Sequence, residues 1–172
     1  LGRDFQARIE TDYYRPEQLG QDRAANVLAA VAEGKAPCLI LDAGTCLTAD
    51  LVGERGVHLG GAIAPGLRAG MEGILASAPH LSASLPSLPL EQTPDLGRDT
   101  RENLALGLTA ALLGTAARLA ERLRLMTNPP ARVILTGGDA TLLAANLQVE
   151  AEVWPELTLE GLRRAYEATG SP

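Results

Sequence analysis

Three short β-prone segments lie close together in the first half of the chain and are joined by turns of three and four residues. Turns this short connect antiparallel neighbours, because a parallel strand needs a crossover of about a dozen residues or more. The pattern therefore predicts a three-stranded antiparallel meander. Its strands read PCLILD at 37–42, CLTADLV at 46–52 and VHLGGAIA at 57–64, separated by AGT and GERG.

Helical patterns flank this meander. The alanine-rich stretch 19–33 has apolar residues at helical spacing, and Gly34 stands where a helix would end. After the meander, Pro65 suits the first turn of a helix, which we expect over 65–81.

The second half of the chain alternates between strand and helix patterns. It opens with a predicted loop that contains Pro86, Pro89 and Pro94. Strands that alternate with helices after a meander indicate an α/β fold. The predicted segments are the loop at 82–100, a long amphipathic helix at 101–125, and strand-then-helix units at 131–147 and 149–168.

Composition excludes several classes of protein. The 172 residues are 46% hydrophobic, which suits one globular domain, and a net charge of -6 argues against binding nucleic acid or an anionic membrane. No charge-free apolar run is long enough to span a bilayer, and no signal peptide is recognisable. Cys38 and Cys46 lack zinc-like or CxxC spacing, so we expect a cytoplasmic location.

Asp42 follows a buried-looking strand and precedes Gly44 and Thr45. A carboxylate here can hold a cation or bind the phosphate side of a ligand, while the glycine lets the backbone come close. Alternatively, the aspartate satisfies the backbone of its own turn. The motif DAGT alone does not decide between these interpretations.

Asp22 and Arg23 stand at the start of the first predicted helix. Considered alone, Asp22 is better explained as a helix-capping acid. The sharper hypothesis pairs the two, with Asp22 accepting a proton and Arg23 binding an anion. Thr100 likewise could be the N-cap of the long helix.

Two glycine turns at strand ends, GGAIAPG at 60–66 and LTGGDA at 135–140, could cradle a nucleotide, although turn glycines need no ligand. In the long helix, Gly107 and Gly114 lie on one face, where packing within the chain is favoured over a dimer seam. His58 and His80 are isolated in the sequence, so no metal site or triad is predicted at either.

Five motifs in this order resemble the type III pantothenate kinase family, part of the actin-like ATPase superfamily. They are YYRPEQLGQDR, DAGTCLTADLV, GGAIAPGLRAGMEGI, GRDTRENLALG and LTGGDA, spanning 13–140. The resemblance implies an α/β actin-like ATPase (ribonuclease H-like) fold with a mixed sheet, mainly its C-terminal lobe. Residues 1–36 would be a remnant of the N-terminal subdomain that carries the acceptor-binding turn and helix, and 37–172 the C-terminal subdomain.

The family resemblance also implies a reaction, ATP-dependent phosphorylation of pantothenate to 4'-phosphopantothenate in coenzyme A biosynthesis. Magnesium and a monovalent cation, potassium or ammonium, would assist, and the protein would be a homodimer with sites near the subunit interface. Asp22 would be the base, and Arg23 a counter-charge for the pantothenate carboxylate. The implied contacts are Tyr13, Gly20, Gln21, Asp22, Arg23 and Thr100 for pantothenate, Thr45, Gly137 and Gly138 for ATP, and Asp42 for the monovalent cation.

The sequence departs from the family pattern in one respect, since no DxGNT-like phosphate loop precedes Asp22. That loop helps to hold magnesium and the nucleotide phosphates. We therefore expect little activity from the isolated chain, which could be a fragment, half of a split enzyme whose DxGNT lobe is a separate polypeptide, or a degenerate relative. The alternative function is a non-catalytic regulatory or assembly protein, related to the accessory transcription factors of the family.

Overall fold

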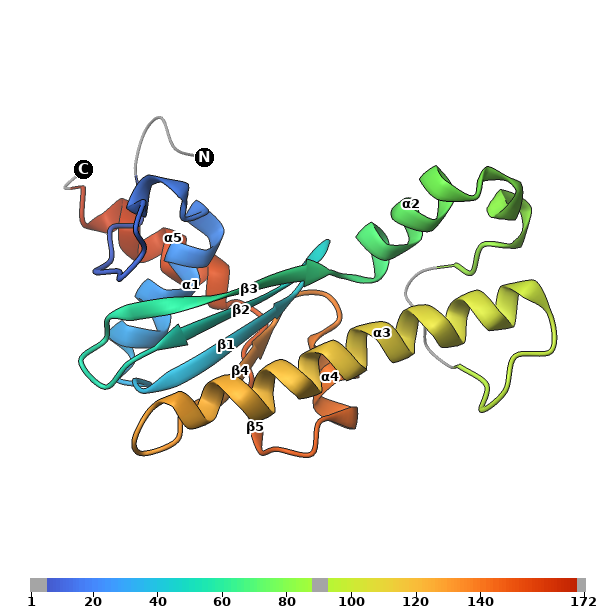
Figure 1. Ribbon diagram of the computed structural model, residues 1–172. Coiled ribbons are helices and arrows are strands. Elements are labelled where there is room, and N and C mark those ends of the chain that lie inside the picture. The colour runs from blue at the N-terminus through green and yellow to red at the C-terminus, as the bar shows by residue number, and fades with distance from the viewer. Residues whose placement is uncertain (1–5, 88–92, 170–172) are drawn as a thin grey trace.

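The structure is a computed structural model that describes residues 6–87 and 93–169 (Figure 1). A five-stranded mixed sheet forms its centre, in the order β3-β2-β1-β4-β5. The first three strands are antiparallel, β4 runs parallel to β1, and β5 runs parallel to β4. The predicted meander and the α/β class are confirmed. The strands are β1 (Cys38–Ala43), β2 (Cys46–Val52), β3 (His58–Pro65), β4 (Arg132–Thr136) and β5 (Ala151–Val153).

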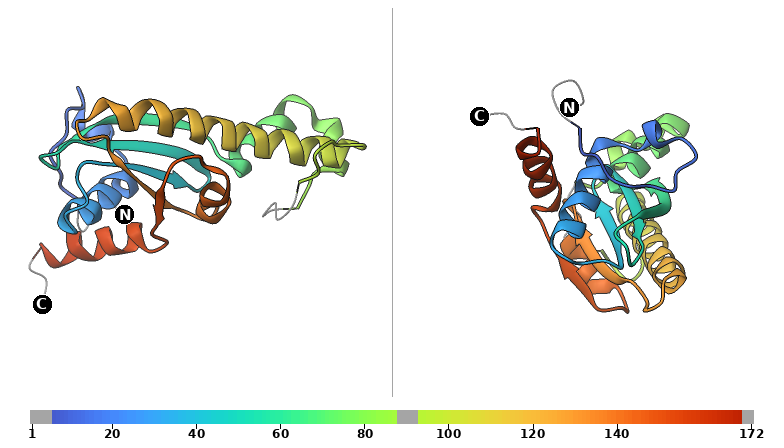
Figure 2. Two further views of the ribbon diagram at one scale, coloured as in Figure 1. Left: turned by 90° about the horizontal axis from the view of Figure 1, so that it is seen from below. Right: turned by 90° about the vertical axis from the view of Figure 1, so that its left-hand side faces the viewer.

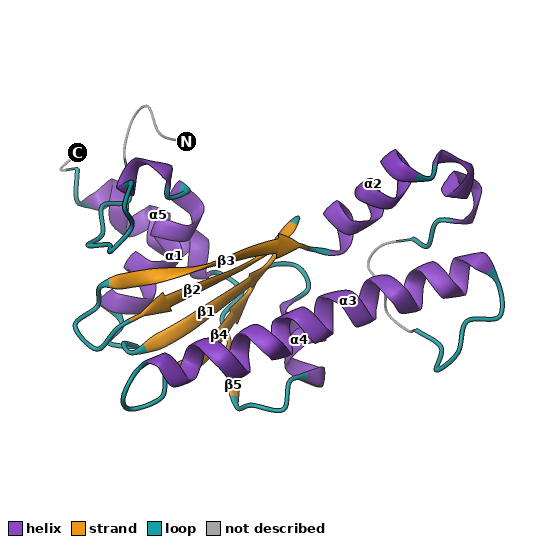
Figure 3. Ribbon diagram, viewed as in Figure 1, coloured by secondary structure: helices purple, strands orange, loops and turns teal. Residues whose placement is uncertain are grey.

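Helices cover both faces of this sheet (Figures 2 and 3). Three helices pack on one face and two on the other, and short 3-10 segments occur at Pro16–Gln18, Pro79–Ser84 and Arg124–Met126. The first face carries α2 (Leu67–Ser77), α3 (Thr100–Leu123) and α4 (Ala140–Asn146), and the second carries α1 (Gln21–Ala32) and α5 (Leu157–Glu167).

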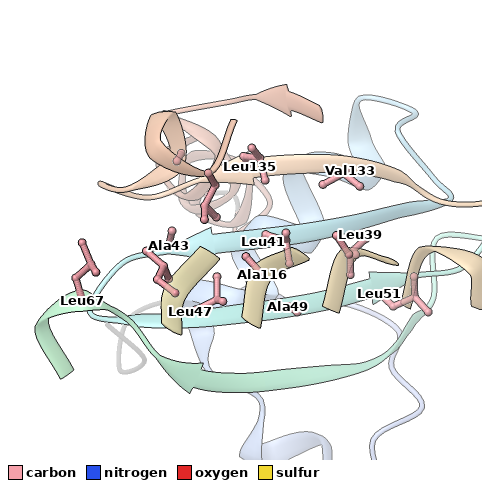
Figure 4. Packing of buried hydrophobic residues seen from close by; sticks show 14 of the residues in the cluster. Leu39, Leu41, Ala43, Leu47, Ala49, Leu51, Leu67, Ala116, Val133 and Leu135 are labelled. Atoms are coloured by element: carbon pink, nitrogen blue, oxygen red, sulfur yellow. The ribbon is translucent and has the colours of Figure 1, made fainter. Parts of the chain in front are cut away.

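The two cores follow from the alternation of side chains along each strand. Leu39, Leu41 and Leu47 point towards α3, where Ala116 lies over them (Figure 4). The intervening residues of β1 face α1 and α5. One of these is Asp42, so the pleat that buries leucines on one face presents a carboxylate on the other.

Close helix packing brings α5 against α1. A Cβ atom added at Gly161 would overlap the carbonyl oxygen of Ala25, so only glycine permits this approach. The contact matters for the site because it places Thr158 of α5 within hydrogen-bond distance of Asn26 in α1. Residues 6–36 therefore pack onto the same sheet as the rest, and their assignment to a separate subdomain stays a prediction.

Several predicted boundaries shift in the structure. Pro65 is the last residue of the edge strand β3, where its missing N–H is tolerated, so the prediction that it opens a helix is wrong. The helix predicted to run to 81 ends at Ser77, because Ala78 precedes Pro79 and residues before proline avoid the α conformation. Gly34, with φ of 65°, follows α1 as expected. Pro89 lies outside the described residues.

Helix α3 begins with an aspartate cap. Asp99 accepts a hydrogen bond from the Glu102 amide at 2.8 Å, and Glu102 accepts one from the Arg98 amide at 2.8 Å. The N-cap is therefore Asp99, and Thr100 is the first helical residue. The segment Thr100–Met126 is long and apolar enough to span a membrane, but its apolar side packs on the sheet. It does not indicate a membrane protein.

Candidate active site

The site begins with Asp42 at the carboxyl end of β1, where the side chain is half-buried. Its Oδ2 accepts a hydrogen bond from Asn26 Nδ2 at 3.0 Å, and Asn26 Oδ1 accepts one from Thr158 Oγ1 at 2.7 Å. Among the described residues Asn26 is its hydrogen-bond partner, and no amide of its own turn is. The turn-forming alternative is therefore not what the structure shows.

The electrostatics at Asp42 favour a cation. Burial raises its pKa, the hydrogen bond from Asn26 opposes the rise, and the carboxylates of Asp22 and Asp50 add to it. Within residues 6–87 and 93–169, no cluster of three or more His, Cys, Asp or Glu side chains could hold a metal ion. A hard cation here would be held by the Asp42 carboxylate with backbone or ligand oxygens, a donor set that suits potassium or magnesium.

Two turns meet beside Asp42, AGT at 43–45 and GGD at 137–139, and we call them the turn pair. The Asp139 amide donates to the Ala43 carbonyl oxygen at 3.0 Å. Gly137 has φ of 88°, and a Cβ atom there would lie 2.6 Å from both the Ala43 backbone and Asp42 Oδ1. The second turn can therefore approach the first only because it carries glycine at 137.

An open cavity of about 430 Å³ adjoins the turn pair. Thr45 and Gly138, two of the predicted ATP contacts, both line it, and Arg68 adds a positive charge. Burial raises the pKa of Asp139 at its edge. The cavity thus combines backbone groups, a hydroxyl and a guanidinium, a set suited to phosphate oxygens.

The predicted acceptor-binding turn forms the start of α1. Its N-cap is Gly20, so Asp22 is not the N-cap residue, but the acid lies in the first turn of the helix and accepts from one of its amides, as expected of a helix-capping acid. Asp22 is exposed in the first turn, and its Oδ1 accepts from the Arg23 amide at 2.9 Å. A Cβ atom at Gly20 would lie 2.5 Å from that oxygen, so glycine makes room for it. Gln21 Oε1 accepts from the Ala7 amide at 2.9 Å, which ties the N-terminal segment to α1.

Arg23 lies beneath this turn with its guanidinium already paired. Its Nε donates to both carboxylate oxygens of Asp50 at 3.1 Å, and Nη2 donates to Asp50 Oδ1 at 2.7 Å. The same Nη2 donates to the Tyr13 hydroxyl at 2.9 Å. Arg23 is 5% exposed and Asp50 is fully buried. The guanidinium therefore already has a buried counter-ion, and its predicted contact with the pantothenate carboxylate stays a prediction.

Asp50 has a second buried partner in His58. His58 Nε2 lies 2.8 Å from Asp50 Oδ1, and its Nδ1 lies 2.9 Å from Thr11 Oγ1. Burial acts to raise the pKa of Asp50, but the hydrogen bonds from His58 and Arg23 outweigh it and hold that pKa below its usual range. We call Thr11, Tyr13, Arg23, Asp50 and His58 the Asp50 network.

Sequence reasoning missed Asp50 and interpreted His58 as isolated. The signal was present in the β2–β3 hairpin, where Asp50 pairs with Gly61 and Val52 pairs with His58. Two polar residues on diagonal positions of neighbouring strands can touch, but only a known register reveals it.

Thr100 is the one predicted site residue that lies apart. It opens α3 at the end that projects beyond the sheet, away from α1, as both views show (Figures 1 and 2). Within this chain, Tyr13, Asp22, Arg23 and Asp42 are brought near one another and Thr100 is not.

Comparisons with known proteins place these features in a family. A family model described as type III pantothenate kinase matches residues 1–122. Type III pantothenate kinases from Thermomicrobium roseum and Akkermansia muciniphila are 38% and 36% identical, over 88% and 96% of this chain and 58% and 67% of their own lengths. One from Syntrophotalea carbinolica is 35% identical over 90% of this chain and 59% of its own length.

Solved structures agree on the fold. A Campylobacter jejuni protein described as a Baf family transcriptional activator superposes with a TM-score of 0.61 at 22% identity, covering 95% of this chain and 69% of that one. Component A of (R)-2-hydroxyglutaryl-CoA dehydratase from Acidaminococcus fermentans gives 0.52 at 15% identity, covering 86% and 68%. The fold is that of the actin-like ATPases.

The chain spans about three-fifths of the length of the first curated relatives that it matches. Over that span, the family match includes the start of α1, the AGT turn and the Asp50 network. On this evidence, the chain belongs to the type III pantothenate kinase family.

Proposed function

We propose that this chain takes part in the ATP-dependent phosphorylation of pantothenate to 4'-phosphopantothenate, the step of coenzyme A biosynthesis that its family name describes. The observation that carries the proposal is the convergence of Asp22, Asp42 and the turn pair at one edge of the sheet, in a chain of this family. The exposed Asp22 carboxylate is close enough to Asp42 to add to the rise of its pKa, and Asp42 lies against Gly137 of the turn pair.

In this proposal Asp22 acts on the acceptor. Its carboxylate orients the 4'-hydroxyl of pantothenate and accepts the hydroxyl proton as the new oxygen–phosphorus bond forms and the bond to ADP breaks. Thr45, Gly137 and Gly138 hold the nucleotide, and Asp42 holds a monovalent cation. Magnesium and that cation, when bound, neutralise charge on the phosphates.

Acceptor binding is assigned to the start of α1 and the segment before it, next to Asp22. The proposed contacts are Tyr13, Gly20, Gln21 and Arg23, and the Tyr13 ring offers an apolar face together with a hydroxyl. Because Asp50 already neutralises Arg23, we expect Arg23 to act on pantothenate through orientation and hydrogen bonding more than through net charge.

The test is a coupled assay with ATP, magnesium, potassium and pantothenate. It compares wild type, Asp22→Asn and the matched exposed control Asp95→Asn, each with and without a polypeptide that carries a DxGNT lobe. We expect Asp22→Asn to lower kcat by about 10²–10⁴-fold and Asp95→Asn to change nothing. Full activity of Asp22→Asn would remove its assigned role.

Binding measurements on the same samples distinguish the kinase from the regulatory alternative. Saturable pantothenate binding with neither nucleotide binding nor turnover, even with the DxGNT lobe supplied, would favour a non-catalytic regulator. The fold likeness to the Campylobacter jejuni protein is the observation behind that alternative. The acidic net charge of -6 supports a protein that binds no nucleic acid, and the spacing of Cys38 and Cys46 supports a reducing cytoplasm.

A homodimer is part of the proposal. Gly107 and Gly114 are exposed, and nothing described lies within 4 Å of a Cβ atom built at either, so the favoured packing within the chain is not observed. If this face packed against a second copy of the chain, the end of α3 that carries Thr100 and projects beyond the sheet would lie at the subunit interface. Gly107→Leu should then weaken self-association in sedimentation by tenfold or more, an effect of about 1.4 kcal/mol. Thr115→Leu, elsewhere on α3, is the control, and an unchanged dimer would remove the assignment.

A further inference from the structure

We propose that Asp50 and His58 are positioning residues that fix Tyr13 and Arg23 for the acceptor, an inference that rests on the proposed function. Neither residue contacts the cavity beside Tyr13. Both are completely buried, and each makes hydrogen bonds that lead back to Tyr13 from a different direction. The Asp50 network is therefore a closed circuit in which Tyr13, half-buried, is the member that lines the cavity.

The direction of each hydrogen bond can be assigned. An ionised Asp50 only accepts, so His58 Nε2 carries a proton and donates it to Asp50. In the neutral imidazole Nδ1 then accepts from the Thr11 hydroxyl. The Thr11 oxygen in turn accepts from the Tyr13 amide at 3.2 Å. One arm of the circuit thus sets the Tyr13 backbone.

The other arm sets the Tyr13 side chain. Asp50 holds the guanidinium of Arg23 by a forked contact, and Arg23 Nη2 donates to the Tyr13 hydroxyl. The Tyr13 ring also lies 5.0 Å from the His58 ring, between centroids. Because the phenol oxygen accepts from Arg23, its own proton is left to donate outwards.

Tyr13 lines an open cavity of about 540 Å³, together with Tyr14, Arg15, Leu59, Gly60 and Gly61 among others. Glycine at 61 is needed beneath it, since a Cβ atom there would overlap the Ala49 carbonyl oxygen and lie 3.1 Å from Arg23 Nη2. The cavity wall is thus mixed apolar and polar, and of its two tyrosines Tyr13 is the one whose hydroxyl is held by Arg23. A site of this kind rejects an acceptor that lacks a matching oxygen.

Stability alone is a poor explanation for the circuit. A buried ion pair costs desolvation that its attraction barely offsets, and apolar replacements are often as stable. Buried polar groups that are fully hydrogen-bonded do, however, specify one geometry. What the Asp50 network supplies is a unique orientation of Tyr13.

The first experiment measures coupling. Thr11→Val removes the hydroxyl between Tyr13 and His58, Thr11→Ser retains it, and His58→Gln keeps an amide N–H donor to Asp50 but has no acceptor at the position of Nδ1. By calorimetry, on the chain together with any DxGNT lobe needed for binding, we expect Thr11→Val and His58→Gln to weaken pantothenate binding about three- to tenfold. Thr11→Ser should bind pantothenate like wild type, and none of the three substitutions should change the affinity for ADP.

Coupling to Tyr13 distinguishes positioning from general destabilisation. In a Tyr13→Ala background, Thr11→Val should cost no further pantothenate affinity, because the residue that it positions is gone. Ile40 is buried and pairs with Asp50 across strands β1 and β2. Ile40→Val is therefore the stability control and should leave pantothenate affinity unchanged. Equal losses in the wild-type and Tyr13→Ala backgrounds would overturn the proposal.

The second experiment needs no ligand. The chain has three tyrosines, so 3-fluorotyrosine labelling gives three ¹⁹F signals, and Tyr13→Phe assigns one of them to Tyr13. That signal should shift in Thr11→Val and His58→Gln but not in Thr11→Ser or Ile40→Val. A responsive signal in a protein that binds no pantothenate even with a DxGNT lobe supplied would refute the proposed function and keep the positioning circuit, whereas an unresponsive signal would refute the circuit itself.

Discussion

The turn pair and the Asp50 network differ in what they are made of. The turn pair is mostly backbone, in which Gly137 lies against Ala43 and Asp139 donates to the same residue. The Asp50 network is mostly side chain, and its members come from the N-terminal segment, α1, β2 and β3. Backbone sites tolerate any side chain that leaves the turn intact, whereas side-chain networks depend on every member. Mutations should therefore act differently on the two regions.

The largest expected effect lies in the Asp50 network. Asp50→Ala leaves the Arg23 guanidinium buried without its partner, which should lower the free energy of unfolding by about 3–5 kcal/mol. Denaturant unfolding measures it, and the exposed Asp95→Ala should stay within about 0.5 kcal/mol of wild type.

A double substitution sharpens the same comparison. Asp50→Leu with Arg23→Met replaces the buried pair by apolar groups and should recover much of the lost stability, because no unpaired charge remains. Pantothenate affinity should stay low, since the Tyr13 hydroxyl has lost its donor. If Asp50→Ala lowered the free energy of unfolding no more than Asp95→Ala does, the Asp50 network would make no contribution to stability.

A smaller effect is expected in the turn pair. Gly137→Ala forces an alanine to a φ of 88° and brings its Cβ within 2.6 Å of Ala43 and Asp42. The strain should cost about 1–3 kcal/mol of unfolding free energy and should weaken ADP binding through the displaced turn. Pantothenate binding to the Asp50 network should change much less.

The neighbouring glycine supplies the matched control. Gly138 has nothing within 4 Å of a built Cβ atom and no positive φ, so Gly138→Ala should be nearly neutral for folding. Similar losses in both variants would show that the turn is sensitive to any side chain, and the backbone account of this region would then fail.

The two regions also differ in how far the sequence predicted them. DAGT and TGGD are contiguous motifs whose glycines report backbone needs, so the sequence predicts turns at two strand ends, and the structure has them at the ends of the neighbouring parallel strands β1 and β4. The roles of Asp42, Thr45 and Gly138 stay predictions. The Asp50 network depends on strand register and on a contact between Thr11 and His58 that are 47 residues apart. No local pattern encodes such a contact, so the sequence predicts Arg23 as a counter-charge for pantothenate without its buried partner Asp50.

Local rules failed where two of them competed. Pro65 is compatible with both a first helical turn and an edge strand, and pairing with Cys46 decided for the strand. Asp99 and Thr100 are both good caps, and the side chain that reached the Glu102 amide became the cap. In each case a tertiary or neighbouring contact chose between options that propensity leaves nearly equal.

Acidification should separate Asp42 from Asp50, because their pKa shifts have opposite signs. Asp42 has a raised pKa, so its charged form costs stability near neutral pH, and a bound cation offsets that cost. Asp50 has a lowered pKa, so its contribution to stability is complete above the usual carboxyl pKa and is lost only as pH falls below it. Potassium at ten times its Kd should therefore stabilise the protein at pH 7 by about 1.4 kcal/mol.

This potassium effect should fade first during acidification, as pH falls through the raised pKa of Asp42, while the Asp50 network is still intact. Thermal unfolding in potassium chloride, with choline chloride at equal ionic strength as the reference, follows it, and Asp42→Asn should abolish it. A potassium effect that persists in Asp42→Asn would place the cation elsewhere. A potassium effect that disappears only at the lower pH where protonation of Asp50 also reduces stability would mean that the two regions unfold as one unit. An independent cation site must lose the charge of Asp42 at the higher pH.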